Sequence, residues 1–234
     1  MNFDTWSPVY EAILEDFGFD RTADERARDA LETRTQPFDW DHLGALAGAH
    51  VAVVGAAPSL ETEASLERLR RAGTDAIVAA SSAVDVLEDH GFEVDCMVTD
   101  LDKNPDTVVQ LTERGTPVAV HAHGDNVPMV KAVVVDCRGA CVLPTTQAEP
   151  VGSVVNVGGF TDGDRAAFLA DHCGADRLTF VGWDFDDPTV DPMKAKKLTW
   201  AERLLYWLER RRGEQFGVLD GRRDPIDTTA LPVE

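Results

Sequence analysis

From His50 onward, short apolar runs rich in valine alternate with segments of helix length, and this alternation limits the fold more than any other feature. The predicted strands are Val51–Gly55, Ala76–Ala80, Val94–Thr99, Pro117–His121, Lys131–Val135 and Leu178–Gly182. Their successive apolar positions suit a sheet that is covered on both faces. The predicted helices between them are Glu61–Ala72, Ala83–His90, Asp106–Arg114 and Gly163–His172. The pattern predicts an α/β fold with a doubly wound, mainly parallel sheet.

Residues 1–45 form a predicted N-terminal helical segment. An apolar stripe with spacings of three and four residues predicts a helix that ends at Gly18. Thr22 and Glu25 have the spacing of a capping box, which predicts a second helix that runs to about residue 33.

Residues 46–213 form the predicted α/β catalytic domain. A long helix, over about Lys194–Arg212, closes this domain. Residues 214–234 contain glycines and prolines at short intervals, which is typical of a loop, so we expect a C-terminal tail.

The charge of the chain bears on its partners and its location. With 42 acidic and 22 basic residues the net charge is −20, which repels phosphate backbones and anionic lipid. We therefore expect no nucleic-acid partner and no membrane partner. A surface this acidic and poor in lysine is typical of proteins from salt-accumulating halophiles. The chain starts without a signal peptide and lacks the roughly 18–20 consecutive apolar residues of a membrane span, so we expect a cytoplasmic protein. Homo-oligomer formation stays open.

Two aspartates follow the third predicted strand, where an open parallel sheet binds its ligands. In Thr99-Asp100-Leu101-Asp102, residues two apart on an extended segment point the same way. Asp100 and Asp102 are therefore predicted to share one Mg²⁺, which takes one or two carboxylates and completes its coordination with waters and phosphates. The alternative is a pair of solvated turn aspartates or a helix cap.

The segment His121–Asn126 follows the next strand and is too polar to be core packing. His121 and His123 alternate onto one face and are able to bind a transition metal, but the neighbouring carboxylates favour Mg²⁺. We therefore interpret these histidines, with Asp125 and Asn126, as phosphate-binding or proton-transferring groups. The alternative is a turn built by Gly124, Asp125 and Asn126.

Thr161 and Asp164 have the spacing of a helix cap, at the start of the predicted helix after Gly158 and Gly159. A cap explains neither the two glycines nor Arg165, a cation in a first helical turn that opposes the helix dipole. We expect Arg165 to lie beside a bound phosphate, with Thr161 and Asp164 as candidates for binding the nucleotide.

Other candidates for binding lie at the ends of the first and last strands and at the final helix. Gly55 and Ser59 belong to a strand-to-helix turn that is either an anion site or a plain turn. Asp184 follows the last strand and is a candidate for binding metal or substrate. Lys194 and Lys197 belong to a cluster with three of the five lysines of the chain, and we expect them to bind triphosphate.

Together these motifs resemble the archaeal 6-hydroxymethyl-7,8-dihydropterin pyrophosphokinase family of the MptE type, which is related to thiamine pyrophosphokinase catalytic domains. The most specific pieces are Thr99–Asp102, His121–Asn126 and Gly158–Arg165, in that order. The resemblance extends from the first helix to the lysine-led final helix. It implies ATP as co-substrate, a divalent metal, and transfer of pyrophosphate to the hydroxymethyl group of a reduced pterin, with release of AMP. The products lead to methanopterin or folate-type carriers.

In this chemistry the pterin hydroxymethyl oxygen attacks the β-phosphorus of ATP. Catalysis of such transfers depends mostly on positioning and charge neutralisation. Asp100 and Asp102 are expected to bind the metal, Arg165 and the lysines to hold negative charge, and Asp125 or a histidine such as His123 to receive the hydroxyl proton.

The chain departs from the family pattern after its first two strands. Ala57 replaces a glycine, and the family's Ala-Asp-Gly-Ala is here Ala80-Ser81-Ser82-Ala83. Ser81 either acts through its hydroxyl toward metal or substrate, or activity is weakened or redirected. Two other functions therefore stay open: pyrophosphate transfer to another alcohol such as thiamine, and a non-catalytic nucleotide- or sugar-nucleotide-binding module.

Overall fold

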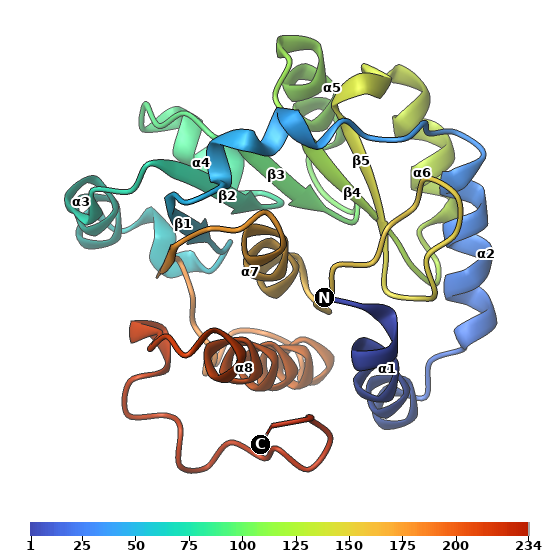
Figure 1. Ribbon diagram of the computed structural model, residues 1–234. Helices are drawn as coiled ribbons and strands as arrows, with labels where there is room; N and C mark the ends of the chain where they lie inside the picture. The colour runs from blue at the N-terminus through green and yellow to red at the C-terminus, as the bar shows by residue number, and fades with distance from the viewer. Residues whose placement is uncertain (234) are drawn as a thin grey trace.

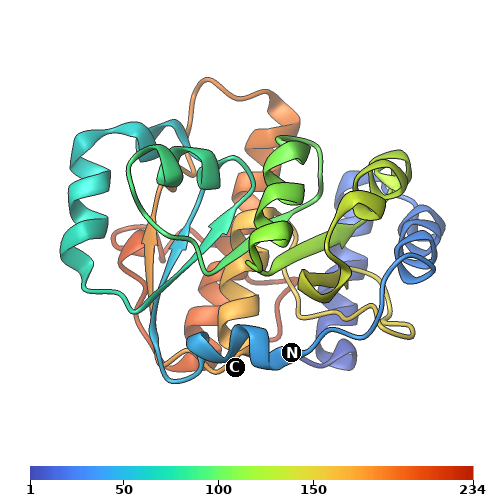
Figure 2. The ribbon, with the colours of Figure 1, turned by 90° about the horizontal axis from the view of Figure 1, so that it is seen from above.

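A parallel six-stranded sheet with helices on both faces forms the centre of the computed structural model, which describes residues 1–233 (Figures 1 and 2). The strands are β1 (His50–Val54), β2 (Ala76–Ala80), β3 (Cys96–Thr99), β4 (Val118–Ala122), β5 (Val142–Thr146) and β6 (Arg177–Val181). They lie in the order β5-β4-β3-β2-β1-β6, and every neighbouring pair is parallel. The predicted fold class is confirmed.

The helices cover the sheet in two layers. They are α1 (Phe3–Phe17), α2 (Arg21–Glu32), α3 (Glu63–Ala72), α4 (Ala83–Asp89), α5 (Pro105–Arg114), α6 (Val127–Val133), α7 (Asp162–His172) and α8 (Pro192–Arg212). One apolar core joins α1, α7 and α8 to one face of the sheet, and a second joins α2 to α6 to the other face (Figure 1). No helix within residues 1–233 is both long and apolar enough to cross a membrane.

One predicted strand, Lys131–Val135, is wrong, and β5 was missed. The segment forms the end of α6 and a following 3-10 turn, because Val130 and Val133, spaced by three, are buried while Val135 is exposed. β5 contains Pro144, which lacks the N–H needed inside a sheet. The strand tolerates this proline because β5 lies at the edge of the sheet.

The N-terminal helices are part of the main core. Gly18 ends α1 with a left-handed φ of 67°, as predicted. The capping box predicted at Thr22 is wrong, because Asp20 caps α2 and accepts a hydrogen bond from the Thr22 N–H at 2.9 Å. Trp6 packs between Phe168 of α7 and Trp207 of α8. The segment 1–45 therefore shares its buried surface with the sheet.

The tail after α8 packs back onto the domain. Phe216 and Leu219 are fully buried, and Glu209 of α8 accepts hydrogen bonds from Arg223. Glu214 accepts the Leu178 N–H on the outer side of β6 at 3.0 Å. The tail thus covers part of an edge strand, which removes groups that otherwise pair with other chains.

Candidate active site

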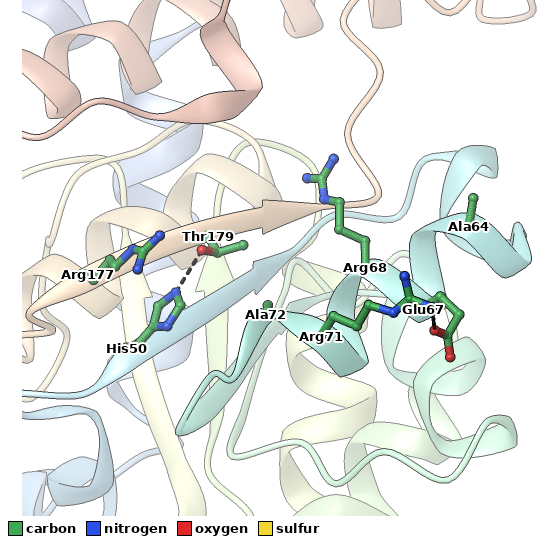
Figure 3. A pocket seen from close by; sticks show the side chains of 8 residues that line it. All are labelled: His50, Ala64, Glu67, Arg68, Arg71, Ala72, Arg177 and Thr179. Carbon is green, nitrogen blue, oxygen red and sulfur yellow. Dashed lines mark hydrogen bonds and ion pairs between the residues drawn. The ribbon is translucent and has the colours of Figure 1, made fainter.

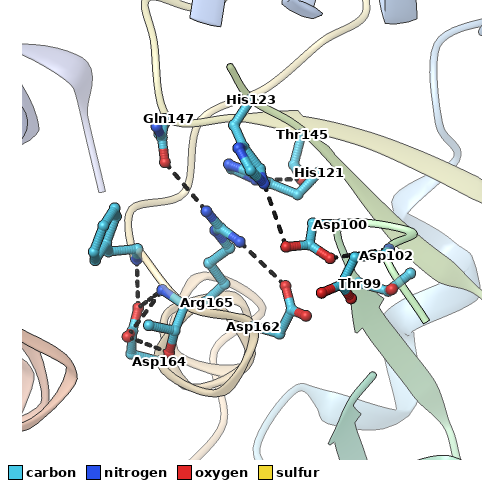
Figure 4. Close-up of polar contacts among 12 residues, drawn as sticks. Thr99, Asp100, Asp102, His121, His123, Thr145, Gln147, Asp162, Asp164 and Arg165 are labelled. Carbon is cyan, nitrogen blue, oxygen red and sulfur yellow. Dashed lines mark hydrogen bonds and ion pairs between the residues drawn. The ribbon is translucent and has the colours of Figure 1, made fainter. Parts of the chain in front are cut away.

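Polar side chains from β3, β4 and α7 meet at the carboxyl end of the sheet. His123 Nε2 lies 3.3 Å from Asp100 Oδ2, so the ends of β3 and β4 are in direct contact. Arg165 and Asp162, from the first turn of α7, lie beside this pair (Figure 4). The structure therefore brings together three of the segments in which the sequence placed functional residues.

Asp100 and Asp102 flank a tight turn. Leu101 has a φ of 69°, so the segment is not extended as predicted, and its side chain is fully buried in the core. The backbone N–H of Asp102 donates to Asp100 Oδ1 at 3.2 Å, which keeps the two residues close. The carboxylates are thus neighbours because of the turn, and not because of strand alternation.

The two carboxylates differ in their affinity for protons. Burial favours a raised pKa for Asp100, but hydrogen bonds with His123 and Asp102 and the charge of Arg165 hold its pKa well below the ordinary range. Burial and the neighbouring Asp100 raise the pKa of Asp102. Two carboxylates this close repel each other when both are ionised, and a divalent cation would relieve that repulsion.

Asp100 and Asp102 fit Mg²⁺ better than a metal ion whose ligands all come from the protein. Within the described residues 1–233, no three histidine, cysteine, aspartate or glutamate side chains are grouped as metal ligands. Mg²⁺ is usually held by one or two carboxylates, with waters and substrate phosphates supplying the other positions. Asp100 and Asp102 provide that number of ligands.

His121 lies behind the pair and is buried. Its Nδ1 is 3.0 Å from Thr145 Oγ1, and that hydroxyl donates to the Val120 carbonyl at 3.1 Å, so Nδ1 carries the proton that Oγ1 accepts. Burial and the charge of Arg165 lower the pKa of His121 well below its ordinary value. A neutral, buried imidazole does not attract phosphate by charge, and the phosphate-binding or proton-transferring role of His121 stays a prediction.

Asn126 organises the loop after β4. Its Nδ2 donates to the carbonyls of Asp100 at 2.8 Å and His121 at 2.7 Å, and its Oδ1 accepts the His123 N–H at 3.0 Å. The carboxamide therefore joins the loop after β3 to the end of β4 by three hydrogen bonds to the backbone. Asp125, which lies between His123 and Asn126 in the chain, is exposed.

Arg165 is buried, and not at an exposed helix end as the sequence suggested. Its Nη1 donates to Asp162 Oδ1 and its Nη2 to Gln147 Oε1, both at 3.1 Å. Burial and the charge of Asp100 raise the pKa of Asp162 to about 7.

Neither Asp162 nor Gln147 was predicted. The sequence could have indicated Asp162, because it lies in the first turn of a helix that was predicted. Gln147 follows the strand β5, which was not predicted, and no sequence pattern indicates a role for it.

The helix cap at the start of α7 is confirmed. Asp164 Oδ2 accepts the Thr161 hydroxyl at 2.8 Å, and the Asp164 carboxylate also accepts the N–H groups of Thr161 and Phe160. These groups shape the turn, so direct nucleotide contact by Thr161 or Asp164 is not supported. Gly159 has a φ of 93°, and a Cβ there would lie 2.6 Å from the Cα of Arg165. Close approach of the chain to α7 explains this glycine.

Two lysines at the start of α8 act on the site by charge. Burial and the charge of Arg165 lower the pKa of Lys197, and Asp100 counters this effect. Lys197 Nζ lies over the Phe160 ring, 6.0 Å from its centre. Lys194 is exposed, and its charge acts on Asp102. Lys196 instead pairs with Asp16 of α1 at 2.8 Å.

Comparison with known proteins identifies the family of the chain. The model of the family described as "6-hydroxymethylpterin diphosphokinase MptE-like" matches residues 31–189. The chain belongs to this family. It is 37% identical to the 6-hydroxymethyl-7,8-dihydropterin pyrophosphokinase of Pyrococcus furiosus, over 89% of this chain and 95% of the relative. It is 34% identical to the protein of that name from Methanothermobacter thermautotrophicus, over 90% and 96%. For the Methanocaldococcus jannaschii protein of that name the identity is 31%, over 89% and 96%.

The predicted membership of a pyrophosphokinase family is therefore confirmed. The match covers the strands and motifs that form the site, from the end of α2 to the loop after β6.

Ser81, a candidate for binding metal or substrate, has two unusual features. Its φ of 46° lies in the left-handed region, and its buried hydroxyl has no hydrogen-bond partner among residues 1–233. Ser81 follows β2 and donates its N–H to the Val98 carbonyl of β3 at 2.8 Å. A strained residue with a free polar group at a strand end is typical of a ligand-facing position.

The ends of β1 and β6 are filled by packing. The Ala57 N–H donates to the Gly182 carbonyl at 3.1 Å, and Trp183 packs against Gly55 while donating to the Val53 carbonyl at 3.2 Å. An open anion site at Gly55 is therefore not supported. The half-buried Ser59 lies in the following 3-10 turn, Pro58–Glu61. Asp184 is exposed.

A groove of about 570 Å³ lies elsewhere on the described part of the chain. It runs along α3 and the edge strand β6 and is lined by His50, Arg68, Arg71, Arg177 and Thr179 among others (Figure 3). None of the residues that meet at the ends of β3 and β4 lines it. The chemistry of the side chains, and not the size of the cavity, therefore identifies the site.

Proposed function

We propose that this chain is a 6-hydroxymethyl-7,8-dihydropterin pyrophosphokinase that transfers pyrophosphate from ATP to the pterin hydroxymethyl group. The product would serve the synthesis of methanopterin or folate-type carriers. The observation that carries the proposal is the Asp100–Asp102 pair beside His123 and Arg165, in a chain of this family. The curated relatives bear the name of this activity.

Asp100 and Asp102 would hold Mg²⁺, since their carboxylates are adjacent and at least partly open to solvent. When bound, Mg²⁺ supplies positive charge to the phosphate oxygens of ATP. Lys194 and the half-buried Lys197 supply further positive charge from the start of α8. Arg165 acts from within the protein, because its charge keeps Asp100 ionised and its Nη1 holds Asp162.

In the proposed reaction the hydroxymethyl oxygen forms a bond to the β-phosphorus as the bond between that phosphorus and the α,β-bridging oxygen breaks. AMP leaves with the electron pair of the broken bond, and the hydroxyl proton must be accepted. His123 is the better placed acceptor. If its Nε2–H donates to Asp100, its Nδ1 is free to take the proton, and the Asp100 carboxylate stabilises the resulting imidazolium. Asp125 is exposed and lacks such a partner.

The test is AMP formation from ATP and Mg²⁺, with and without 6-hydroxymethyl-7,8-dihydropterin, and with thiamine in its place. Phosphorus NMR distinguishes the pyrophosphate ester of the pterin from inorganic products. We expect AMP and the ester in equal amounts, only when the pterin is present. Preference for thiamine would assign another alcohol, and nucleotide binding without turnover would favour the non-catalytic module.

A further inference from the structure

A buried carboxylate in the N-terminal helices connects to the site from behind. Asp24 of α2 is 3% exposed, and three donors meet its two oxygens. Oδ2 accepts the Tyr10 hydroxyl and the Gln147 Nε2, both at 2.7 Å, and Oδ1 accepts the Gly124 N–H at 2.6 Å. A carboxylate that is removed from water needs hydrogen-bond donors, and these three donors compensate the burial of Asp24.

The contact with Asp24 decides which end of the Gln147 carboxamide faces the site. A carboxamide has a donating end and an accepting end. Because Nε2 donates to Asp24, Oε1 is turned to the guanidinium of Arg165, whose Nη2 donates to it at 3.1 Å. The Gln147 backbone is also held, since its carbonyl accepts Trp6 Nε1 and Asn156 Nδ2 at 2.9 Å. The carboxamide is thus a fixed link between Asp24 and Arg165.

The same carboxylate also fixes the loop that carries His123. The Gly124 N–H lies directly after His123, and its bond to Asp24 Oδ1 joins residues a hundred positions apart. Asp24 therefore anchors two parts of the site. One is the β4 loop, whose His123 contacts Asp100, and the other, through Gln147, is Arg165 of α7, which binds Asp162 of the same helix.

We propose that Asp24 is a positioning residue for pyrophosphate transfer, acting through Gln147 on Arg165 and through Gly124 on the His123 loop. This inference rests on the proposed function. Without an acceptor at Gln147, Arg165 loses one of its two hydrogen-bonded partners in a buried environment, where an unsatisfied charged donor is costly. The guanidinium is then free to turn from Asp162. The N-terminal helices are, in this view, part of the catalytic apparatus.

Four variants test this inference. Asp24→Asn places a donor where an acceptor is required, so either Gly124 or Gln147 loses its bond. Gln147→Leu removes the link. The double variant Asp24→Asn with Gln147→Glu reverses donor and acceptor, because the new carboxamide donates to a carboxylate that still accepts from Arg165. Tyr10→Phe is the matched control, since it deletes one hydrogen bond to Asp24 and leaves the Gln147 link intact.

We expect kcat to fall roughly 10- to 100-fold in Asp24→Asn and in Gln147→Leu, with KM for ATP and pterin little changed. The double variant should recover most of the loss, and Tyr10→Phe should keep wild-type kcat despite lower stability. Circular dichroism and melting curves establish that each variant is folded at the assay temperature. Unchanged kcat in Gln147→Leu, or equal losses in Tyr10→Phe and Gln147→Leu, would overturn the inference.

NMR of the Arg165 guanidinium separates this inference from the proposed function. Held at both Nη atoms, the group should rotate slowly and show resolved Nη–H signals in the wild type, assigned with Arg165→Lys, and lose them in Gln147→Leu. A wild type without turnover but with these signals would refute the proposed function alone. The same fast rotation in wild type and Gln147→Leu would refute the positioning role, whatever the turnover.

Discussion

The backbone at Gly159 lies close to α7, and the energetic importance of this contact can be measured by comparing Gly159 with Gly174 at the other end of the helix. Gly159 precedes the helix and Gly174 follows it, with φ of 93° and 82°. Alanine is strained in this region by about 1–2 kcal/mol at either position. At Gly174 a Cβ meets nothing within 4 Å, whereas at Gly159 it would lie 2.6 Å from the Arg165 Cα and 2.7 Å from its N. These are backbone atoms, so no rotamer change relieves the overlap.

We therefore expect Gly174→Ala to lower the free energy of unfolding by about 1–2 kcal/mol, because only the backbone strain of alanine at a positive φ contributes there. Gly159→Ala should cost about 2–5 kcal/mol, because overpacking adds about 1–3 kcal/mol. Urea unfolding followed by circular dichroism measures both.

The two variants should also differ in activity. Relief of the overlap at Gly159 moves the backbone that carries Arg165 and Asp162, and a misplacement of about 1 Å can cost about 10²-fold in rate. Gly174→Ala should keep wild-type kcat. Equal stability losses in the two variants, together with full activity of Gly159→Ala, would refute the account of this turn.

Four other outcomes are expected. Asp100→Asn should lower kcat about 10²–10³-fold at saturating Mg²⁺ with unchanged circular dichroism, while Asp106→Asn, at an exposed aspartate of α5, keeps its activity. Ser81→Asp should change the Mg²⁺ dependence or the preferred divalent ion in the turnover assay, and unchanged dependence would place Ser81 outside the site. Because burial raises the pKa of Asp162 to about 7 from its ordinary 3.8, the folded protein retains a proton that the unfolded chain releases, and stability is lost as pH rises through 7. In EDTA, urea unfolding should show that the stability of the wild type relative to Asp162→Asn falls by about 2–3 kcal/mol between pH 5 and pH 8. The net charge of −20 should make the melting temperature rise with KCl between about 0.1 and 2 M, because the Debye length shrinks to about 3 Å at 1 M, and a flat or falling curve would remove the halophile interpretation.

Local patterns were enough to predict the sheet and the residues that follow its strands. Apolar runs of strand length and helices with capped ends depend on neighbours in the chain, so β1 to β4, β6 and the cap at Thr161 were recognised. The Lys131–Val135 error and the missed β5 have different causes, because β5 contains Pro144, which is unusual inside a sheet, whereas Lys131–Val135 is rich in valine. A short valine-rich run fits either a strand or one buried face of a helix, and only packing decides between them.

The placement of Asp100 and His123 at a common edge also followed from the sequence, because the strands of a parallel sheet all end on the same side. Their contact at 3.3 Å agrees with that inference. The family of the chain was equally available from these motifs.

Tertiary structure alone decided which side chains complete the site and which only support it. Asp24 and Gln147 are 123 residues apart, and no spacing in the sequence links them. Burial also changed the role of Arg165, since a guanidinium enclosed by Asp162 and Gln147 acts through its charge and not by open contact with a phosphate. The physical reason is the same in both cases: the sequence specifies the groups, whereas their exposure and hydrogen-bond partners depend on segments that only folding brings together.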